Sequence, residues 1–332
     1  MNPRKDLPYI PTSDSTVVLR HGDRAFCDQL GARDVWVWKH EDTFFMHYDA
    51  AGDSGWLAAL ATSKDGVNWS KHGPVLALGA AGSTDAGSAS YGTTYFDGTK
   101  WHMFYLGTPN VSQDGLRTPS FPYQTLKAEA PSPYGPWRKR PDIVPFIAKP
   151  DSWYDDTASP GQIVQTDDGY IMLFSAATTV NGSVQRTLGI ARTRDLDSTW
   201  TVDSEPALPL KEQIENSSLH FEPATKTWYL FTNHIGRADD VTPVPPQLTT
   251  EYTDAIWVYW TTDVTRWDPT KRAVVIDANS AGWSPRVIGL PSVVVNGNRL
   301  AVYYDGAVAD DISHGHRDVA VTYIDLPLAN GV

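Results

Sequence analysis

Short apolar segments rich in aromatic residues recur along the chain, each after a short polar turn. Five of them resemble one another, at residues 44–50, 101–107, 170–176, 228–234 and 300–306. Most of the turns contain the Asp, Asn and Gly residues that tight hairpins require. A further apolar segment precedes each turn, at 35–39, 90–96, 161–165, 217–222 and 290–295. The pattern therefore predicts five β-hairpins.

The hairpins belong to larger units. A third strand is predicted after four of them, at 57–63, 187–193, 255–261 and 319–325, and a fourth strand follows a Trp in four units, at Trp69, Trp137, Trp200 and Trp267. These Trp residues are 68, 63 and 67 positions apart, close to one fifth of the 332-residue chain. Four-stranded units repeated at this interval predict a five-bladed β-propeller formed by residues 1–332 as one domain. An irregular β-sandwich is the alternative.

The fifth unit lacks a fourth strand of its own. The N-terminal segment 15–22 has the composition of a strand and could supply it. This pairing would close the ring and remove an exposed sheet edge. We therefore expect the N-terminal strand to complete the last blade.

Composition supports an all-β fold and excludes several classes of function. Thirteen Trp, fifteen Tyr, twenty-five Gly and twenty-four Pro indicate short strands and many turns, and not a helical bundle. A net charge of −12 argues against nucleic acid or an anionic membrane as a partner. Cys27 is the only cysteine, so an intramolecular disulfide and a thiolate metal cluster are excluded.

The N-terminal residues contain basic side chains with no apolar run after them, and no run of eighteen apolar residues occurs. We therefore expect a cytoplasmic protein without a membrane partner. The alternative is a secreted or periplasmic protein whose signal peptide has been removed. Nucleotide-binding glycine motifs, the H-E-x-x-H zinc motif and the G-x-S-x-G elbow are also missing from the sequence.

Acidic residues precede the first strand of three units. They are Asp34, the pair Asp155 and Asp156, and Glu215. Since the first strand of a propeller blade lines the central axis, these carboxylates could meet at one end of it. Of the pair, Asp156 is the preferred candidate because it lies nearer the strand.

These residues resemble the catalytic set of the five-bladed glycoside hydrolases of family 43 and their relatives. The likeness extends over nearly the whole chain and includes the S-x-D-G-x-x-W corner at 63–69. Two departures indicate a divergent branch, with family 117 as one candidate: Val35 replaces the Pro that usually follows the first acid, and Asn216-Ser217 follow Glu215. The resemblance implies an inverting glycosidase acting on an oligosaccharide or glycan.

The resemblance also implies a role for each acid. Asp34 would be the general base, Glu215 the general acid, and Asp156 the residue that orients Glu215 and modulates its pKa. In family 117 a histidine has the acid role, so His316 or His314 could replace Glu215. A histidine of the last blade reaches the axis in the resembled family, which makes His316 our candidate for contact with the sugar or with a central metal ion.

Further side chains are candidates for binding sugar. Asp85 and Tyr91 precede or begin the second unit's first strand, Arg286 precedes the fifth, and Trp153 could form an aromatic wall. Each of them could also be an ordinary surface or core residue.

Two long segments between strands, 112–124 and 238–254, could narrow the funnel to a pocket, which would favour exo action. No cofactor is expected to be required, although a structural or central cation such as calcium would fit the family. The competing hypothesis is a non-catalytic carbohydrate-binding propeller.

Overall fold

The computed structural model describes residues 7–237, 251–309 and 312–328. Within these ranges the chain forms strands, two short 3-10 helices and no α-helix. Neither helix, η1 (Arg24–Phe26) or η2 (Leu210–Glu212), has the length and apolarity needed to cross a membrane. The expected all-β class is confirmed.

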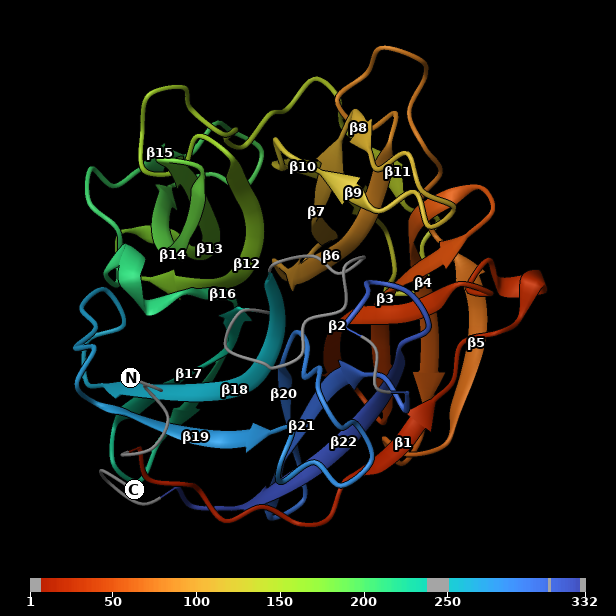
Figure 1. The fold of residues 1–332 in the computed structure, drawn as a ribbon. Coiled ribbons are helices and arrows are strands. Elements are labelled where there is room, and N and C mark those ends of the chain that lie inside the picture. Colours follow the sequence, from red (N-terminus) through yellow and green to blue (C-terminus); the bar gives the residue numbers. More distant parts are fainter. Residues whose placement is uncertain (1–6, 238–250, 310–311, 329–332) are drawn as a thin grey trace.

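The strands form antiparallel sheets set around a common centre (Figure 1). One four-stranded sheet contains β12 (Thr157–Thr166), β13 (Gly169–Val180), β14 (Ser183–Thr193) and β15 (Thr201–Val202). The next contains β16 (Ile214–Glu222), β17 (Thr227–Arg237), β18 (Glu251–Thr261) and β19 (Arg272–Asp277). In both sheets the strands pair in chain order, as the hairpin pattern predicts.

The N-terminal part of the chain forms an eight-stranded sheet with two parts. The first contains β2 (Gly31–His40), β3 (Thr43–Gly52), β4 (Gly55–Ser63) and β5 (Trp69–Pro74). The second contains β6 (Ser88–Phe96), β7 (Trp101–Thr108), β10 (Gln124–Ala130) and β11 (Arg138–Lys139). Only two residue pairs, Trp56 with Ser88 and Leu57 with Ala89, join the two parts in parallel pairing. A small hairpin of β8 (Asn110–Val111) and β9 (Pro119–Ser120) lies between β7 and β10.

The remaining sheet joins the two ends of the chain. It contains β20 (Ser292–Asn296), β21 (Arg299–Gly306), β22 (Asp318–Asp325) and the N-terminal β1 (Thr16–Leu19). Strand β1 pairs antiparallel with β22, with Thr16 opposite Val321. The expectation that an N-terminal strand completes the last sheet is confirmed.

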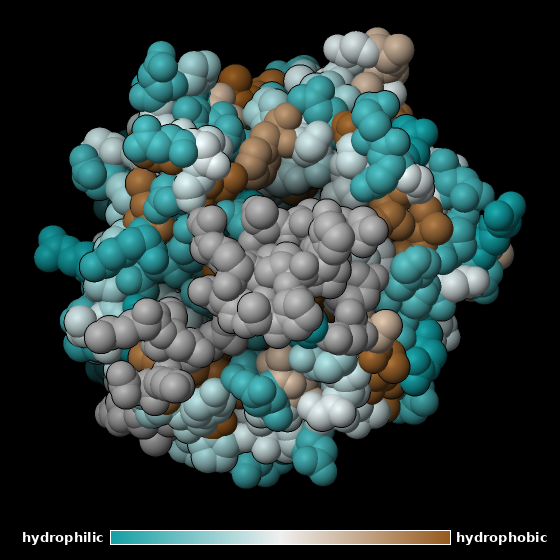
Figure 2. All heavy atoms as spheres, in the orientation of Figure 1, coloured by the Kyte–Doolittle hydropathy of each residue, from teal (hydrophilic) through white to brown (hydrophobic). Residues whose placement is uncertain are grey.

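The hydrophobic core is divided among the spaces between neighbouring sheets. One cluster joins β3 to β21, with Tyr48 and Tyr303 both fully buried. Another joins β17 to β21 through Phe231 and Val302. Since the first and last sheets share a core cluster, the arrangement is a closed ring. On the face shown in Figure 2, apolar residues of the described chain form separate small patches among hydrophilic ones.

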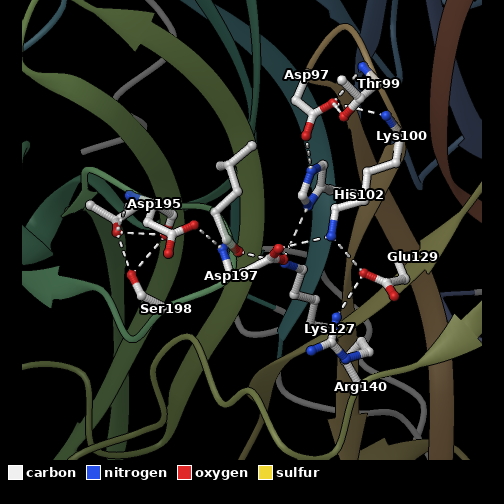
Figure 3. A network of polar contacts seen from close by, with 12 residues as sticks. Asp97, Thr99, Lys100, His102, Lys127, Glu129, Arg140, Asp195, Asp197 and Ser198 are labelled. Carbon is white, nitrogen blue, oxygen red and sulfur yellow. Dashed lines mark hydrogen bonds and ion pairs between the residues drawn. The ribbon is translucent and has the colours of Figure 1, made fainter.

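A network of charged side chains also links two neighbouring sheets (Figure 3). Lys127 of β10 is buried, and its Nζ donates to the Leu196 carbonyl at 2.6 Å and to the Asp197 carboxylate. Asp197 lies in the turn between β14 and β15, and it also accepts from Lys100 at 2.8 Å. Lys100 in turn donates to Glu129 at 2.8 Å. Polar contacts therefore reinforce the apolar packing at this boundary.

Candidate active site

A cavity of about 140 Å³ lies where the first strands of several sheets converge. Polar and charged side chains dominate its wall. The charged and hydroxyl-bearing side chains that line it come from β2, β3, β6, β9–β10, β12, β13, β14, β16 and nearby loops, and include Arg33, Asp34, Asp49, Ser90, Tyr91, Thr118, Tyr123, Thr157, Ser159, Ser175, Arg186, Glu215 and His314. Such a wall suits a ligand rich in hydroxyl groups.

An extra residue in four of the first strands, β2, β6, β12 and β16, shapes this wall. Between Arg33 and Trp36 the chain advances three residues on β2 against two on β3, which defines a β-bulge. Strands β6, β12 and β16 shift register in the same way, and in β16 the shift lies between Glu215 and Ser218. Because a bulge breaks the alternation of side chains, two consecutive residues can face the cavity.

The bulges also free backbone N–H groups, which neighbouring side chains satisfy. Asp34 has a φ of 50°, and its N–H donates to Asp305 Oδ2 at 3.1 Å. Asn216 has a φ of 63°, and its N–H donates to Ser175 Oγ at 2.7 Å. The Tyr91 N–H donates to the Asp49 carboxylate. Polar side chains of the second strands, Asp305, Ser175 and Asp49, thus hold the backbone of the bulges in place.

Asp34 is one of two candidate catalytic carboxylates in the cavity. Its side chain is 14% exposed, and its oxygens accept from Arg33 Nη2 at 2.9 and 3.0 Å. Burial raises the pKa of Asp34; Arg33 opposes this rise and the nearby Asp305 carboxylate adds to it. A carboxylate with a raised pKa is a stronger base than an exposed one.

Glu215 is the other candidate catalytic carboxylate, and it lies on β16, in a different sheet from Asp34. Its Oε2 accepts from Arg186 Nη1 at 3.2 Å and its Oε1 from Asn233 Nδ2 at 3.4 Å. Arg186 also donates from Nη2 to Glu251 Oε2 at 3.1 Å. Each candidate catalytic carboxylate therefore has its own guanidinium partner: Arg33 for Asp34, and Arg186 for Glu215.

Tyr91 lines the cavity as expected and lies near both acids. Its hydroxyl is within 3.0 Å of Asn216 Oδ1 and 3.3 Å of the Pro160 carbonyl. Burial raises the pKa of Tyr91 well above its usual range, and the carboxylates of Asp34, Asp49 and Glu215 add to the rise. The hydroxyl therefore keeps its proton and acts as a donor.

The two histidines of the last loop have different positions. His316 is exposed, has a φ of 56°, and its ring lies 5.7 Å from that of His21, so it does not line the cavity. His314 does line it, and its Nδ1 lies 2.5 Å from Arg33 Nη1. The preference for His316 over His314 was therefore wrong as to position, because the loop turns between them.

Asp156 is not among the described residues that line the cavity. Side chains alternate along β12, so Thr157 and Ser159 face the cavity while Asp156 and Ala158 face away. The Asp156 carboxylate instead accepts from Thr179 Oγ1 at 2.6 Å. The structure thus brings Asp34 and Glu215 together without Asp156.

Three further candidates also lie outside the cavity lining. Asp85 is buried in a separate hollow, where it accepts from Lys139 Nζ at 2.5 Å and Tyr105 Oη at 2.9 Å. Trp153 stacks on Phe174, with ring centroids 5.8 Å apart, and packs against a core cluster. Arg286 is half-buried and is not one of the lining residues. Local packing and ion pairing hold the first two in these places.

Four charged residues of the site were missed by sequence reasoning: Arg33, Asp49, Arg186 and Glu251. Asp49 offered a signal, because it interrupts an apolar strand at 44–50 and is nearly fully buried. Burial raises its pKa well above the usual range, and the neighbouring Asp34 adds to the rise. Of the predicted loops, 112–124 contributes Thr118, Pro119 and Tyr123 to the wall, whereas most of 238–254 lies outside the described residues.

The described part of the chain contains no group of three or more His, Cys, Asp or Glu side chains arranged to hold a metal ion. The exposed His316, our candidate ligand, is likewise not part of such a group.

No family model matches the sequence, and no curated protein matches it. Solved structures with the same fold do exist. A protein described as a glycoside hydrolase aligns with 99% of this chain and 95% of its own at 13% identity and a TM-score of 0.72. A thermostable family-43 glycoside hydrolase aligns with 91% and 92% at 16% identity and a TM-score of 0.62. The catalytic domain of a Coprinopsis cinerea GH62 α-L-arabinofuranosidase aligns with 96% and 98% at 11% identity and a TM-score of 0.61. The chain thus shares the fold of propeller-type glycoside hydrolases.

Proposed function

We propose that this protein is a glycoside hydrolase that removes a terminal sugar from an oligosaccharide or glycan. The observation that carries the proposal is the pair of carboxylates, Asp34 from β2 and Glu215 from β16, in the wall of one polar cavity. Glycoside cleavage requires two such groups, one to protonate the leaving oxygen and one to activate water or attack the sugar. The fold shared with known glycoside hydrolases supports the same reading.

The scaffold is taken to be a five-bladed propeller, with the eight-stranded sheet counted as two blades. Its two parts are joined by only two residue pairs, and a core cluster lies between them as it does between the other sheets. A cavity at the centre of such a ring, with a wall built by loop 112–124, favours exo action.

In this proposal Asp34 is the general base. Its raised pKa strengthens it as a proton acceptor, and the bonds to Arg33 fix the orientation of its carboxylate. The N–H bond to Asp305 holds the backbone at the bulge, so the position of the base depends on a second buried carboxylate.

Glu215 is the proposed general acid. The alternative, a histidine acid, is disfavoured for His314, because burial lowers the pKa of His314 well below its usual range and leaves the ring neutral at pH 7. If the enzyme inverts configuration, the two carboxyl groups should stand roughly 6.5–9.5 Å apart when substrate is bound. Analysis of the first-formed anomer by NMR would test this point.

The test is a screen of the wild type against aryl pentosides, aryl hexosides and natural oligosaccharides, with Asp34→Asn and Glu215→Gln alongside. We expect hydrolysis that falls about 100-fold or more in Asp34→Asn, as is typical for loss of an acid–base group. Glu215→Gln should lose least with good leaving groups, because these need little protonation. Asp156→Asn is the control, because Asp156 does not line the cavity, and this variant should be as active as the wild type.

Two results would contradict the proposal. Full activity of Glu215→Gln on a natural glycoside would remove its role as acid. Binding of sugars by the wild type with no hydrolysis across the panel would favour a carbohydrate-binding propeller. Circular dichroism of each variant would establish that the loss of activity is not loss of folding.

A further inference from the structure

A second hollow of about 230 Å³ adjoins the cavity of the proposed active site. Four side chains line both spaces: Arg33, Arg186, Glu215 and His314. The second hollow is also lined by Arg317, so three guanidinium groups surround the junction. A ligand that reaches from one space to the other must pass these groups.

The two arginines at the junction have unused donors. Arg33 is nine-tenths buried, and its Nη1 and Nη2 contact His314 and Asp34, while its Nε has no hydrogen-bond partner among the described residues. Arg186 likewise uses Nη1 and Nη2 on Glu215 and Glu251, and its Nε is buried without a described partner. Buried donors without acceptors are costly, so a ligand that supplies acceptors is favoured there.

His314 adds a further donor. Its Nδ1 faces an Arg33 N–H and therefore acts as the acceptor, so in the neutral ring the proton lies on Nε2. Besides burial, the charges of Arg33, Arg317 and Arg186 lower the pKa of His314. The ring thus lies close to three guanidinium groups, each of which also pairs with a carboxylate.

The carboxylates of the wall already accept hydrogen bonds. Asp34 accepts from Arg33, Glu215 from Arg186, and Asp49 from the Tyr91 N–H. Thr157 Oγ1, buried in the same wall, has no described partner either. The unpartnered nitrogen atoms of Arg33 and Arg186 can only donate, so an acceptor group would satisfy them.

We propose that the substrate carries an anionic oxygen group, a carboxylate or a sulfate ester, which binds between Arg33, Arg186 and His314. The inference rests on the glycosidase function proposed above. A sugar hydroxyl brings its own proton and so satisfies fewer of these donors than an acceptor-only oxygen does. Charge-assisted bonds from guanidinium groups to carboxylate are also stronger than neutral ones.

The test is calorimetric binding of a matched series to the wild type. Methyl xyloside, methyl glucoside and methyl glucuronide differ only at C5, where they carry hydrogen, a hydroxymethyl group and a carboxylate; the galacturonide series is measured in the same way. Methyl glucoside 6-sulfate and inorganic phosphate are added as separate arms. We expect a charged sugar to bind about tenfold or more tightly than its neutral counterparts, as one charge-assisted bond supplies.

Two variants of β14 provide the matched control. Arg186→Gln removes a guanidinium from the junction and should abolish the preference for charge. Arg192→Gln removes a guanidinium group from the same strand, but this group lies on the surface, where it donates to Asp203 at 2.7 Å. This variant should keep the preference for charged sugars. The wild-type series stands on its own if Arg186→Gln fails to fold.

The outcomes separate this inference from the proposed function. Equal binding of charged and neutral sugars overturns the inference, even if a neutral glycoside is hydrolysed. Preferential binding of the charged sugars without hydrolysis of any glycoside supports it and overturns the glycosidase proposal. Binding of inorganic phosphate but of no charged sugar overturns it too, because the anion would then be a free co-substrate.

Discussion

The buried ion pair of Asp305 and Arg317 makes the sharpest prediction on stability. The two side chains are 0% and 1% exposed, and Arg317 Nη1 lies 2.9 Å from Asp305 Oδ1. Asp305 also accepts the N–H of Asp34, and Arg317 donates to Thr253 Oγ1 at 3.2 Å. The change to make is Asp305→Asn, which keeps the shape and removes the charge.

Removing one partner of a buried pair leaves the other charge unpaired and costs about 3–5 kcal/mol. At about 2 °C per kcal/mol for a chain of this size, the Tm should fall by about 6–10 °C. The variant should also lose activity, because the backbone of Asp34 loses an anchor. Urea unfolding followed by Trp fluorescence, together with calorimetry, would measure the loss.

Two controls fix the interpretation. Asp203→Asn breaks the exposed pair with Arg192, whose side chain is 43% exposed, and should cost no more than about 1 kcal/mol. The double change Asp305→Leu with Arg317→Met removes both charges and should cost less than Asp305→Asn alone. Equal stability of Asp305→Asn and Asp203→Asn, or a double variant that is the least stable of all, would contradict this prediction.

Three further predictions concern other buried groups. Gly289→Ala would put a Cβ into the buried Asp305 carboxylate, so it should lower both Tm and activity; an unchanged Tm would contradict this. The pKa of Asp49 is raised above its unfolded value of 3.8, so the wild type should lose stability as pH rises from about 4 toward the folded pKa. In Asp49→Asn the plot of Tm against pH should be flatter over that window, and parallel plots would refute the argument. Lys127→Met removes charge-assisted hydrogen bonds from the network in Figure 3. It should lower the free energy of unfolding, measured by urea titration, by about 1.5–3 kcal/mol. An unchanged urea midpoint would show that these bonds contribute little to stability.

The strands were predictable because each hairpin carries its own local signal. Turn residues lie between two apolar segments, and regularly spaced Trp residues mark the last strand of four units. The role of β1 followed from a count, since one unit lacked a strand that only the N-terminal segment could provide. Local sequence signals were sufficient for the first conclusion, and the number of strands per unit for the second.

The site was only partly predictable, because its geometry depends on register. Asp34 and Glu215 were identifiable as acids near strand starts. The phase of alternation in β12 turns Asp156 away from the cavity, and a difference of one residue decides that outcome. Arg33 and Asp34 both face the cavity because β2 has a bulge between Arg33 and Trp36. No residue type in the sequence indicates that bulge.

The pairing of β1 with β22 has a consequence for how the protein is made. Thr16 leaves the ribosome early, but its partner Val321 follows 305 residues later, which takes roughly 15–60 s at about 5–20 residues per second. Until then β1 has no strand to pair with and the ring cannot close. We therefore expect nascent chains arrested before β22 to be cleaved by protease within residues 15–22, and released full-length chains to be protected there.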